Sequence, residues 1–314
     1  MRAALHVLTE ELRRLKTAGV KTVAVSDASL AALRKVVAAG KTADRKPEAG
    51  NAASARVSMP ATKLTAPRAP ESMRAAQTSS APASSPFAAI PSVPPTVTLP
   101  AGDKAARWAA LKEMVLNDAT CRAHVRPGKK VVLGVGSLDA RIMFVGEAPG
   151  ADEEIKGEPF VGPAGQLLTK MIQGMGLKRE DVYIGNIMNW RPEMVVAPGA
   201  EQVGNRPPNE EEMRYCLPYL RAQIEVVNPE LLVALGSTAA QGLLGFGSFK
   251  ALGEIRGQWR EFAGKPLMVT YHPSYILRNQ SNRSKRMIWE DLLKVMERAA
   301  LPVSEKQRGY FLEK

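Results

Sequence analysis

Residues 140–165 read ARIMFVGEAPGADEEIKGEPFVGPAG, and the way this stretch changes character decides the fold. It begins as a short apolar run of bulky and β-branched side chains, which is typical of a buried strand. Glycine- and proline-rich turns follow, with several carboxylates between them, and a helical pattern starts at residue 163. The order strand, glycine turn, helix predicts the first unit of a parallel α/β sheet.

The same order recurs along the chain. After 140–147, further short apolar runs occupy 181–188, 230–236 and 266–272, and helical patterns occupy 163–176, 209–228, 237–245 and 287–300. Strands that alternate with helices imply right-handed crossovers and a sheet covered on both faces. We therefore predict a three-layer αβα sandwich with a central four-stranded, mainly parallel sheet.

Composition divides the 314 residues into four parts. Residues 41–100 are rich in Ala, Pro, Ser and Thr, and such a segment buries too little apolar surface to offset its ordering entropy. We predict a disordered linker there. It joins a small N-terminal helical or docking element, 1–40, to a compact domain at 101–300, and a C-terminal tail covers 301–314.

The net charge of +12 is concentrated at the N-terminal end. Residues 1–100 hold 14 Lys and Arg against 6 Asp and Glu, which leaves 29 against 25 for the rest. A basic arm increases affinity for a polyanion through counterion release and steering. A merely soluble extension explains the same charge. The leucines at helical spacing in residues 5–15 indicate that this element binds an unidentified protein.

Cysteine content and hydropathy indicate in which cellular compartment the protein works. Cys121 and Cys216 are the only cysteines, too few for a disulfide framework, which favours a reducing cytoplasm. No apolar run approaches the ~20 residues that span a bilayer. We expect a cytoplasmic monomer without membrane contact.

Polar residues end the predicted strands, at the edge where parallel sheets bind ligands. Glu147 follows the first strand, Asn186 ends the second, and His272 ends the fourth. A lone His is often structural, and Phe160 in the glycine loop is either a core residue or a face for a planar ring. The loop lacks the dinucleotide-binding spacing of glycines, and no Walker-type lysine follows a glycine loop.

Four motifs, GEAPGADEEIKGEPFVGPAGQLL, YIGNIMNWRP, NRPP and YHPSYILR, resemble in order and spacing those of the family-four uracil-DNA glycosylases. The resemblance covers about residues 121–297. It implies the αβα fold and a monofunctional hydrolase that cleaves the N-glycosidic bond of uracil in DNA and starts base-excision repair. A catalytically inactive DNA- or protein-binding module with the same fold is the alternative.

The resemblance also implies roles for individual residues. Glu147 would hold the attacking water, Phe160 would stack on the flipped base, Asn186 would read the uracil edge, and His272 would hydrogen-bond the uracil oxygen as charge accumulates. These four side chains suit an enzyme that extracts a base from the DNA base stack and stabilises the charge that develops on it. Ala148 stands where other glycosylases of the superfamily have a water-activating Asp. Asp152 and Glu153 are therefore alternative candidates to Glu147 for positioning the water.

The same resemblance implies roles for two further groups of residues. Gly146 and Gly150 would let the backbone approach the base, and Ser274 would belong to the loop that enters the duplex. The basic residues of that loop would contact phosphates: Arg278, Arg283, Lys285 and Arg286.

The chain departs from the family at the cofactor. The family carries four cysteines on a four-iron four-sulfur cluster, and the matching positions here are Cys121, His124, Trp190 and Cys216. A cluster needs four ligands and Trp cannot ligate iron, so we predict that no cluster is bound and that no metal site remains. Zinc held by Cys121, His124 and Cys216 is the alternative, although structural zinc sites normally have four protein ligands.

Overall fold

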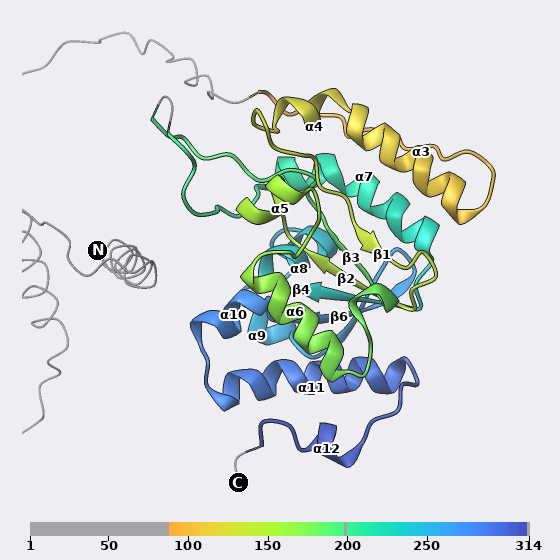
Figure 1. Cartoon of the computed structure of the whole chain (residues 1–314), viewed down its shortest axis with the longest axis vertical. Helices are drawn as coiled ribbons and strands as arrows, with labels where there is room; N and C mark the ends of the chain where they lie inside the picture. Colours follow the sequence, from red (N-terminus) through yellow and green to blue (C-terminus); the bar gives the residue numbers. More distant parts are fainter. Residues whose placement is uncertain (1–87, 198–199, 313–314) are drawn as a thin grey trace, which may run out of the picture. The chain divides into compact units, whose positions relative to one another are not determined.

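The computed structural model describes residues 88–197 and 200–312 (Figure 1). The chain divides into two units, Met1–Gln77 and Thr78–Lys314, and the described residues all belong to the second. The predicted element at 1–40 and most of the predicted linker at 41–100 therefore lie outside the described residues.

The described residues form one mixed sheet in the order β1-β3-β2-β4-β6-β5. Its strands are β1 (Val135–Gly136), β2 (Ile142–Gly146), β3 (Tyr183–Asn186), β4 (Leu231–Leu235), β5 (Trp259–Phe262) and β6 (Lys265–Thr270). The four central strands are parallel and are the four predicted from sequence, which confirms the αβα class. The edge strands β1 and β5 are antiparallel and were not predicted, because one has two residues and the other is largely exposed.

Helices cover both faces of the sheet. They are α3 (Lys104–Asn117), α4 (Ala119–Ala123), α5 (Ala151–Lys156), α6 (Pro163–Gly174), the short 3₁₀ turn η1 (Arg179–Asp181), α7 (Glu210–Val227), α8 (Ser237–Leu244), α9 (Leu252–Ile255), α10 (Pro273–Arg278), α11 (Asn282–Arg298) and α12 (Glu305–Arg308). The helical patterns noted in the sequence correspond to α6, α7, α8 and α11. Throughout the described ranges, every helix is too short or too polar to traverse a lipid bilayer.

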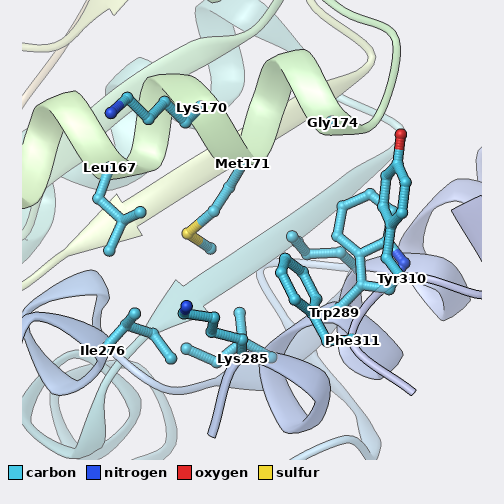
Figure 2. Close-up of a pocket in the computed structure, with 11 residues that line it drawn as sticks. Leu167, Lys170, Met171, Gly174, Ile276, Lys285, Trp289, Tyr310 and Phe311 are labelled. Carbon is cyan, nitrogen blue, oxygen red and sulfur yellow. The ribbon is translucent and has the colours of Figure 1, made fainter. Parts of the chain in front are cut away.

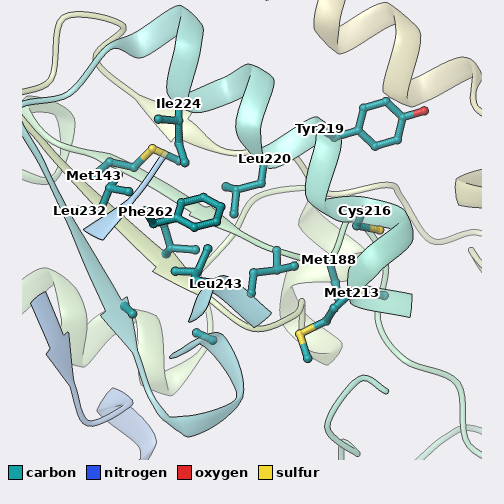
Figure 3. Close-up of a cluster of buried hydrophobic side chains, with 14 of the residues drawn as sticks. Met143, Met188, Met213, Cys216, Tyr219, Leu220, Ile224, Leu232, Leu243 and Phe262 are labelled. Carbon is teal, nitrogen blue, oxygen red and sulfur yellow. The ribbon is translucent and has the colours of Figure 1, made fainter. Parts of the chain in front are cut away.

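Two hydrophobic cores lie on either side of the sheet because side chains alternate along each strand. Met143 and Val145 of β2 face the core formed with α3, α7 and α8, part of which is drawn in Figure 3. Ile142 and Phe144 face the opposite core, formed with α6 and α11. Every residue of β2 and β4 is buried, as expected for parallel strands covered on both faces.

The packed body extends beyond 101–300 in both directions. In the stretch before α3, Ile90, Val97 and Leu99 pack against the first core. At the other end, the Trp289 indole nitrogen of α11 donates a hydrogen bond to the backbone oxygen of Gln307 in α12 at 2.6 Å. The tail is therefore docked on α11.

The parallel registers bring the carboxyl ends of the central strands to one edge. Gly146 at the end of β2 is paired with Asn186 at the end of β3, and Leu235 of β4 is paired with Thr270 of β6. The loops that follow these strands therefore meet at the same edge, where the sequence placed the ligand site.

Candidate active site

A cavity of about 270 Å³ opens at this edge of the sheet. The residues that line it come from the loops after the central strands, from the starts of α5 and α6, and from both ends of α10: Glu147, Ala148, Gly150, Glu153, Phe160, Ala164, Asn186, Asn205, His272, Ser274 and Arg278. Most of the residues singled out in the sequence are therefore brought together around one space.

Phe160, Asn186 and His272 converge although they are far apart in the sequence. The Phe160 and His272 rings have centroids 5.6 Å apart and are tilted by 33°. A Cβ built on Gly146 would lie 2.4 Å from Oδ1 of Asn186 and 2.5 Å from Cζ of Phe160. Both side chains thus lie directly over Gly146, so any larger residue at this position would displace them.

The loop that carries Phe160 is held in an uncommon conformation. Phe160 has φ of +54°, a region that bulky residues rarely adopt, yet its side chain is only 6% exposed. The Glu153 carboxylate accepts hydrogen bonds from the backbone N–H groups of Val161 and Gly162, each at 3.0 Å, and from that of Gly150 at 3.1 Å. Glu153 thus holds the two glycine loops together. The sequence had suggested it only as an alternative to Glu147 for positioning the water.

Asn186 offers an open acceptor to the cavity. It is 6% exposed, and its Oδ1 is buried without a hydrogen-bond partner among the described residues. An unpaired buried amide oxygen costs free energy unless a ligand supplies a donor. The position suits a planar ligand that presents an N–H group.

His272 is held as a neutral imidazole in one tautomer. It is the N-cap of α10, and its Nδ1 accepts a hydrogen bond from the backbone N–H of Ser274 at 3.2 Å. The ring proton of the neutral form is therefore on Nε2. Burial, assisted by the positive charge of Arg278, lowers the pKa of His272 to about 4. At neutral pH this imidazole can donate one hydrogen bond without carrying a charge.

Glu147 lines the cavity directly after the end of β2. Burial raises its pKa, while a hydrogen bond from Thr238 at the start of α8 and the charge of Arg278 act in the opposite direction. Arg278 therefore influences both Glu147 and His272. A half-buried carboxylate and a neutral imidazole that line the same cavity can orient a water and stabilise positive charge on a ligand.

The other basic residues of the predicted DNA loop lie away from the cavity. Arg283 is exposed in the first turn of α11. Lys285 lines a different, apolar cavity of about 310 Å³ between α6, α11 and the tail, shown in Figure 2. Arg286 donates to the backbone oxygens of Arg308 and Tyr310, so it fastens the tail.

Sequence reasoning missed Asn205 and the arginine that places it. Asn205 lines the cavity, and its Oδ1 accepts a hydrogen bond from Arg191 at 2.7 Å. Arg191 is 5% exposed and also contacts Glu154 of α5 at 2.8 Å. The available signal was the NRPP motif, which marks the end of the loop at 192–206 and contains Asn205.

The four positions that match the family's cluster ligands also lie together. Cys121, Trp190 and Cys216 are fully buried, and His124 is 4% exposed. Both cysteines are free thiols, and a hydrogen bond with Cys216, together with burial, raises the pKa of Cys121. The Trp190 indole stacks on His124 and occupies the interior of the site.

These residues do not fit an iron–sulfur cluster. An indole provides no ligand atom for iron, and in the ranges that the structure covers no group of three or more His, Cys, Asp or Glu is arranged to hold a metal ion. The same finding gives no support to the alternative zinc site.

Comparison with known proteins agrees with this geometry. Residues 133–293 match the family model described as the uracil DNA glycosylase superfamily. The chain is 42% identical over 185 residues to the type-4 uracil-DNA glycosylase of Thermotoga maritima, covering 59% of this chain and 90% of that protein. It is 43% identical over 169 residues to the type-4 enzyme of Archaeoglobus fulgidus, 52% and 79% of the two chains. It is 31% identical over 170 residues to the type-5 enzyme of Pyrobaculum aerophilum, 52% and 73% of the two.

Proposed function

This chain belongs to the type-4 uracil-DNA glycosylases of the uracil DNA glycosylase superfamily, and on that premise we propose that it hydrolyses the N-glycosidic bond of uracil in DNA. It is a glycosidase of base-excision repair, and its substrate is DNA that contains uracil. The observation that carries the proposal is the convergence of Phe160, Asn186 and His272 on one cavity.

The cavity offers what an extruded uracil requires. A base can be attacked only after it leaves the stack, and the enzyme must then supply a stacking face and hydrogen bonds to the base edge. Phe160 provides the face. The open Oδ1 of Asn186 accepts from the uracil N3–H group, and a cytosine, which has no such proton, would leave this oxygen unpaired.

Catalysis consists mainly of stabilising charge. As the bond breaks, negative charge gathers on the uracil oxygen and positive charge on the sugar. Nε2–H of neutral His272 donates to that oxygen, and Arg278 adds a positive charge nearby. Glu147 holds the water and faces the cationic sugar. Gly150 and Ser274 complete the wall around the base.

Further properties belong to the same proposal. We propose that the enzyme works without an iron–sulfur cluster, supported by Trp190 in the ligand position. Two free thiols support a cytoplasmic location. We also propose that it acts as a monomer, and that the basic residues 1–100 contribute non-specific DNA affinity or bind a protein through 1–40.

A cleavage assay tests the function. Pure protein is incubated with a labelled oligonucleotide that contains one uracil, then treated with alkali, and a matched thymine oligonucleotide serves as the control. We expect strand scission only at uracil. Because each side chain contributes a hydrogen bond in the transition state, His272→Ala and Asn186→Ala should each lose about 10²–10³-fold in kcat. Tight binding of the uracil strand without scission would instead identify a binding module.

A further inference from the structure

A stacked pair of rings occupies two of the four positions that match the family's cluster ligands. The Trp190 indole, in the segment after β3, lies parallel to the His124 imidazole at the end of α4, with centroids 5.0 Å apart and planes 11° apart. The Tyr215 ring of α7 lies on another side of Trp190, with centroids 6.3 Å apart. We call His124 and Trp190 the His–Trp stack. Together with Tyr215, it joins three segments that are distant in the sequence.

Glu193 fixes the orientation of the imidazole. Nδ1 of His124 lies 2.9 Å from Oε2 of Glu193, and the two side chains are 3% and 16% exposed. Glu193 and Trp190 belong to the same short segment and stand on either side of Arg191. His124 therefore holds this segment at two points, by stacking at one end and by a hydrogen bond at the other.

Arg191, between these two points, organises the loop at 192–206. Its guanidinium donates to Glu154, to Asn205 and to the backbone oxygen of Gly204. Asn205 lines the cavity, and Glu154 belongs to α5, whose N-terminus carries the glycine loop. A shift of the segment that holds Arg191 would thus be transmitted to the cavity wall.

We propose that the His–Trp stack and Glu193 are a metal-free fastening that positions Arg191 and, through it, Asn205 for the reaction. His124, Trp190 and Glu193 are positioning residues, since none of them lines the cavity. The proposal rests on the proposed glycosylase function for its kinetic part. Its structural part, the ordering of the loop residues 192–197 and 200–206, does not depend on that function.

The test uses the full-length chain and two separate measurements. Amide hydrogen exchange reports the order of the loop, for instance at the Met194 N–H that donates to Gln202 Oε1 at 3.1 Å. In His124→Ala we expect exchange in 192–206 to accelerate about tenfold, while the buried strands β2 and β4 keep their protection. We expect kcat on the uracil oligonucleotide to fall about tenfold with little change in KM, because a misplaced side chain affects the reacting geometry.

Conservative variants separate positioning from general instability. Trp190→Phe keeps a flat ring and removes an indole N–H that finds no partner within the described part of the chain, so both measurements should stay close to wild type. Glu193→Gln keeps an acceptor for His124, whereas Glu193→Ala does not, so only the alanine variant should behave like His124→Ala. Glu230→Gln, which breaks the exposed ion pair with Arg141, is the matched control.

The possible results are distinct. Unchanged exchange in 192–206 for both His124→Ala and Glu193→Ala would overturn the proposal. Faster exchange there with unchanged kcat would overturn its kinetic part. If wild type fails to excise uracil, the proposed function fails, and the exchange experiment alone decides whether the fastening exists.

Discussion

Arg191 connects the cavity, through Asn205, with the His–Trp stack, through its sequence neighbour Trp190, and each place contains buried polar atoms that no described residue satisfies. In the cavity the atom is Oδ1 of Asn186, which borders open space that a ligand can enter. In the stack there are two, the Trp190 indole N–H and Nε2 of His124. An unpaired buried atom therefore has a different meaning in each place: Oδ1 of Asn186 is kept for a ligand, and the two atoms of the stack accompany rings that fill volume.

Removing the ring should give the largest effect on stability. Trp190→Ala deletes a fully buried side chain from the first core, and we expect a loss of about 3–5 kcal/mol in the free energy of unfolding. Urea denaturation measures it, and Trp190→Phe should lose clearly less. Equal stability of the alanine variant and wild type would show that the Trp190 ring does not fill buried volume in the His–Trp stack. The difference between the stack and the cavity would then be contradicted.

The next effect concerns pH and the cavity. The pKa of His272 is about 4 in the folded chain, against an ordinary value of 6.5. Between these values the unfolded chain binds a proton that the folded chain does not, so stability falls as the pH drops from about 6.5 to about 4 and this contribution is constant above that range. The full contribution is about 3 kcal/mol.

The measurement is urea unfolding at pH 7, 5.5 and 4.5 for wild type and for His272→Gln. The difference between the two proteins isolates His272 from the carboxylates, and we expect the variant to lose less stability on acidification. NMR offers a direct check, because the chain has only three histidines. A His272 titration near 6.5 would contradict the half-buried, neutral imidazole.

The sequence predicted the parallel centre of the sheet and the convergence at its edge because those depend on strand order and on where polar residues follow apolar runs. Glu147, Asn186 and His272 each end or follow such a run. It could not predict what depends on a side chain's partner. Glu153 looks like any acidic residue in a loop until its three backbone donors are seen. Arg191 gives no periodic signal, and the sequence gives no sign that Arg286 donates to the backbone of the docked tail.

A smaller effect of opposite sign is expected at Asn186. Because its Oδ1 is unpaired in the free protein, Asn186→Ala removes a buried polar atom without breaking a hydrogen bond. We expect the free energy of unfolding to stay within about 1 kcal/mol of wild type or to rise, although activity is lost. Chemical denaturation of the variant measures this. A loss as large as that of Trp190→Ala would mean that Asn186 serves the fold and not the ligand.

The smallest effect separates the cavity from the DNA-facing surface. Arg283 is exposed in the first turn of α11, where a cation is unfavourable for the helix dipole, so helix stability does not account for it. If it contacts a phosphate, Arg283→Gln should reduce the slope of log binding affinity against log salt by about 0.9, with kcat unchanged. Arg298→Gln, exposed in the last turn of the same helix, is the matched control and should leave the slope unaltered. Equal slopes for the two variants would remove Arg283 from the DNA surface and leave Arg278, at the cavity wall, as the cation through which this loop acts.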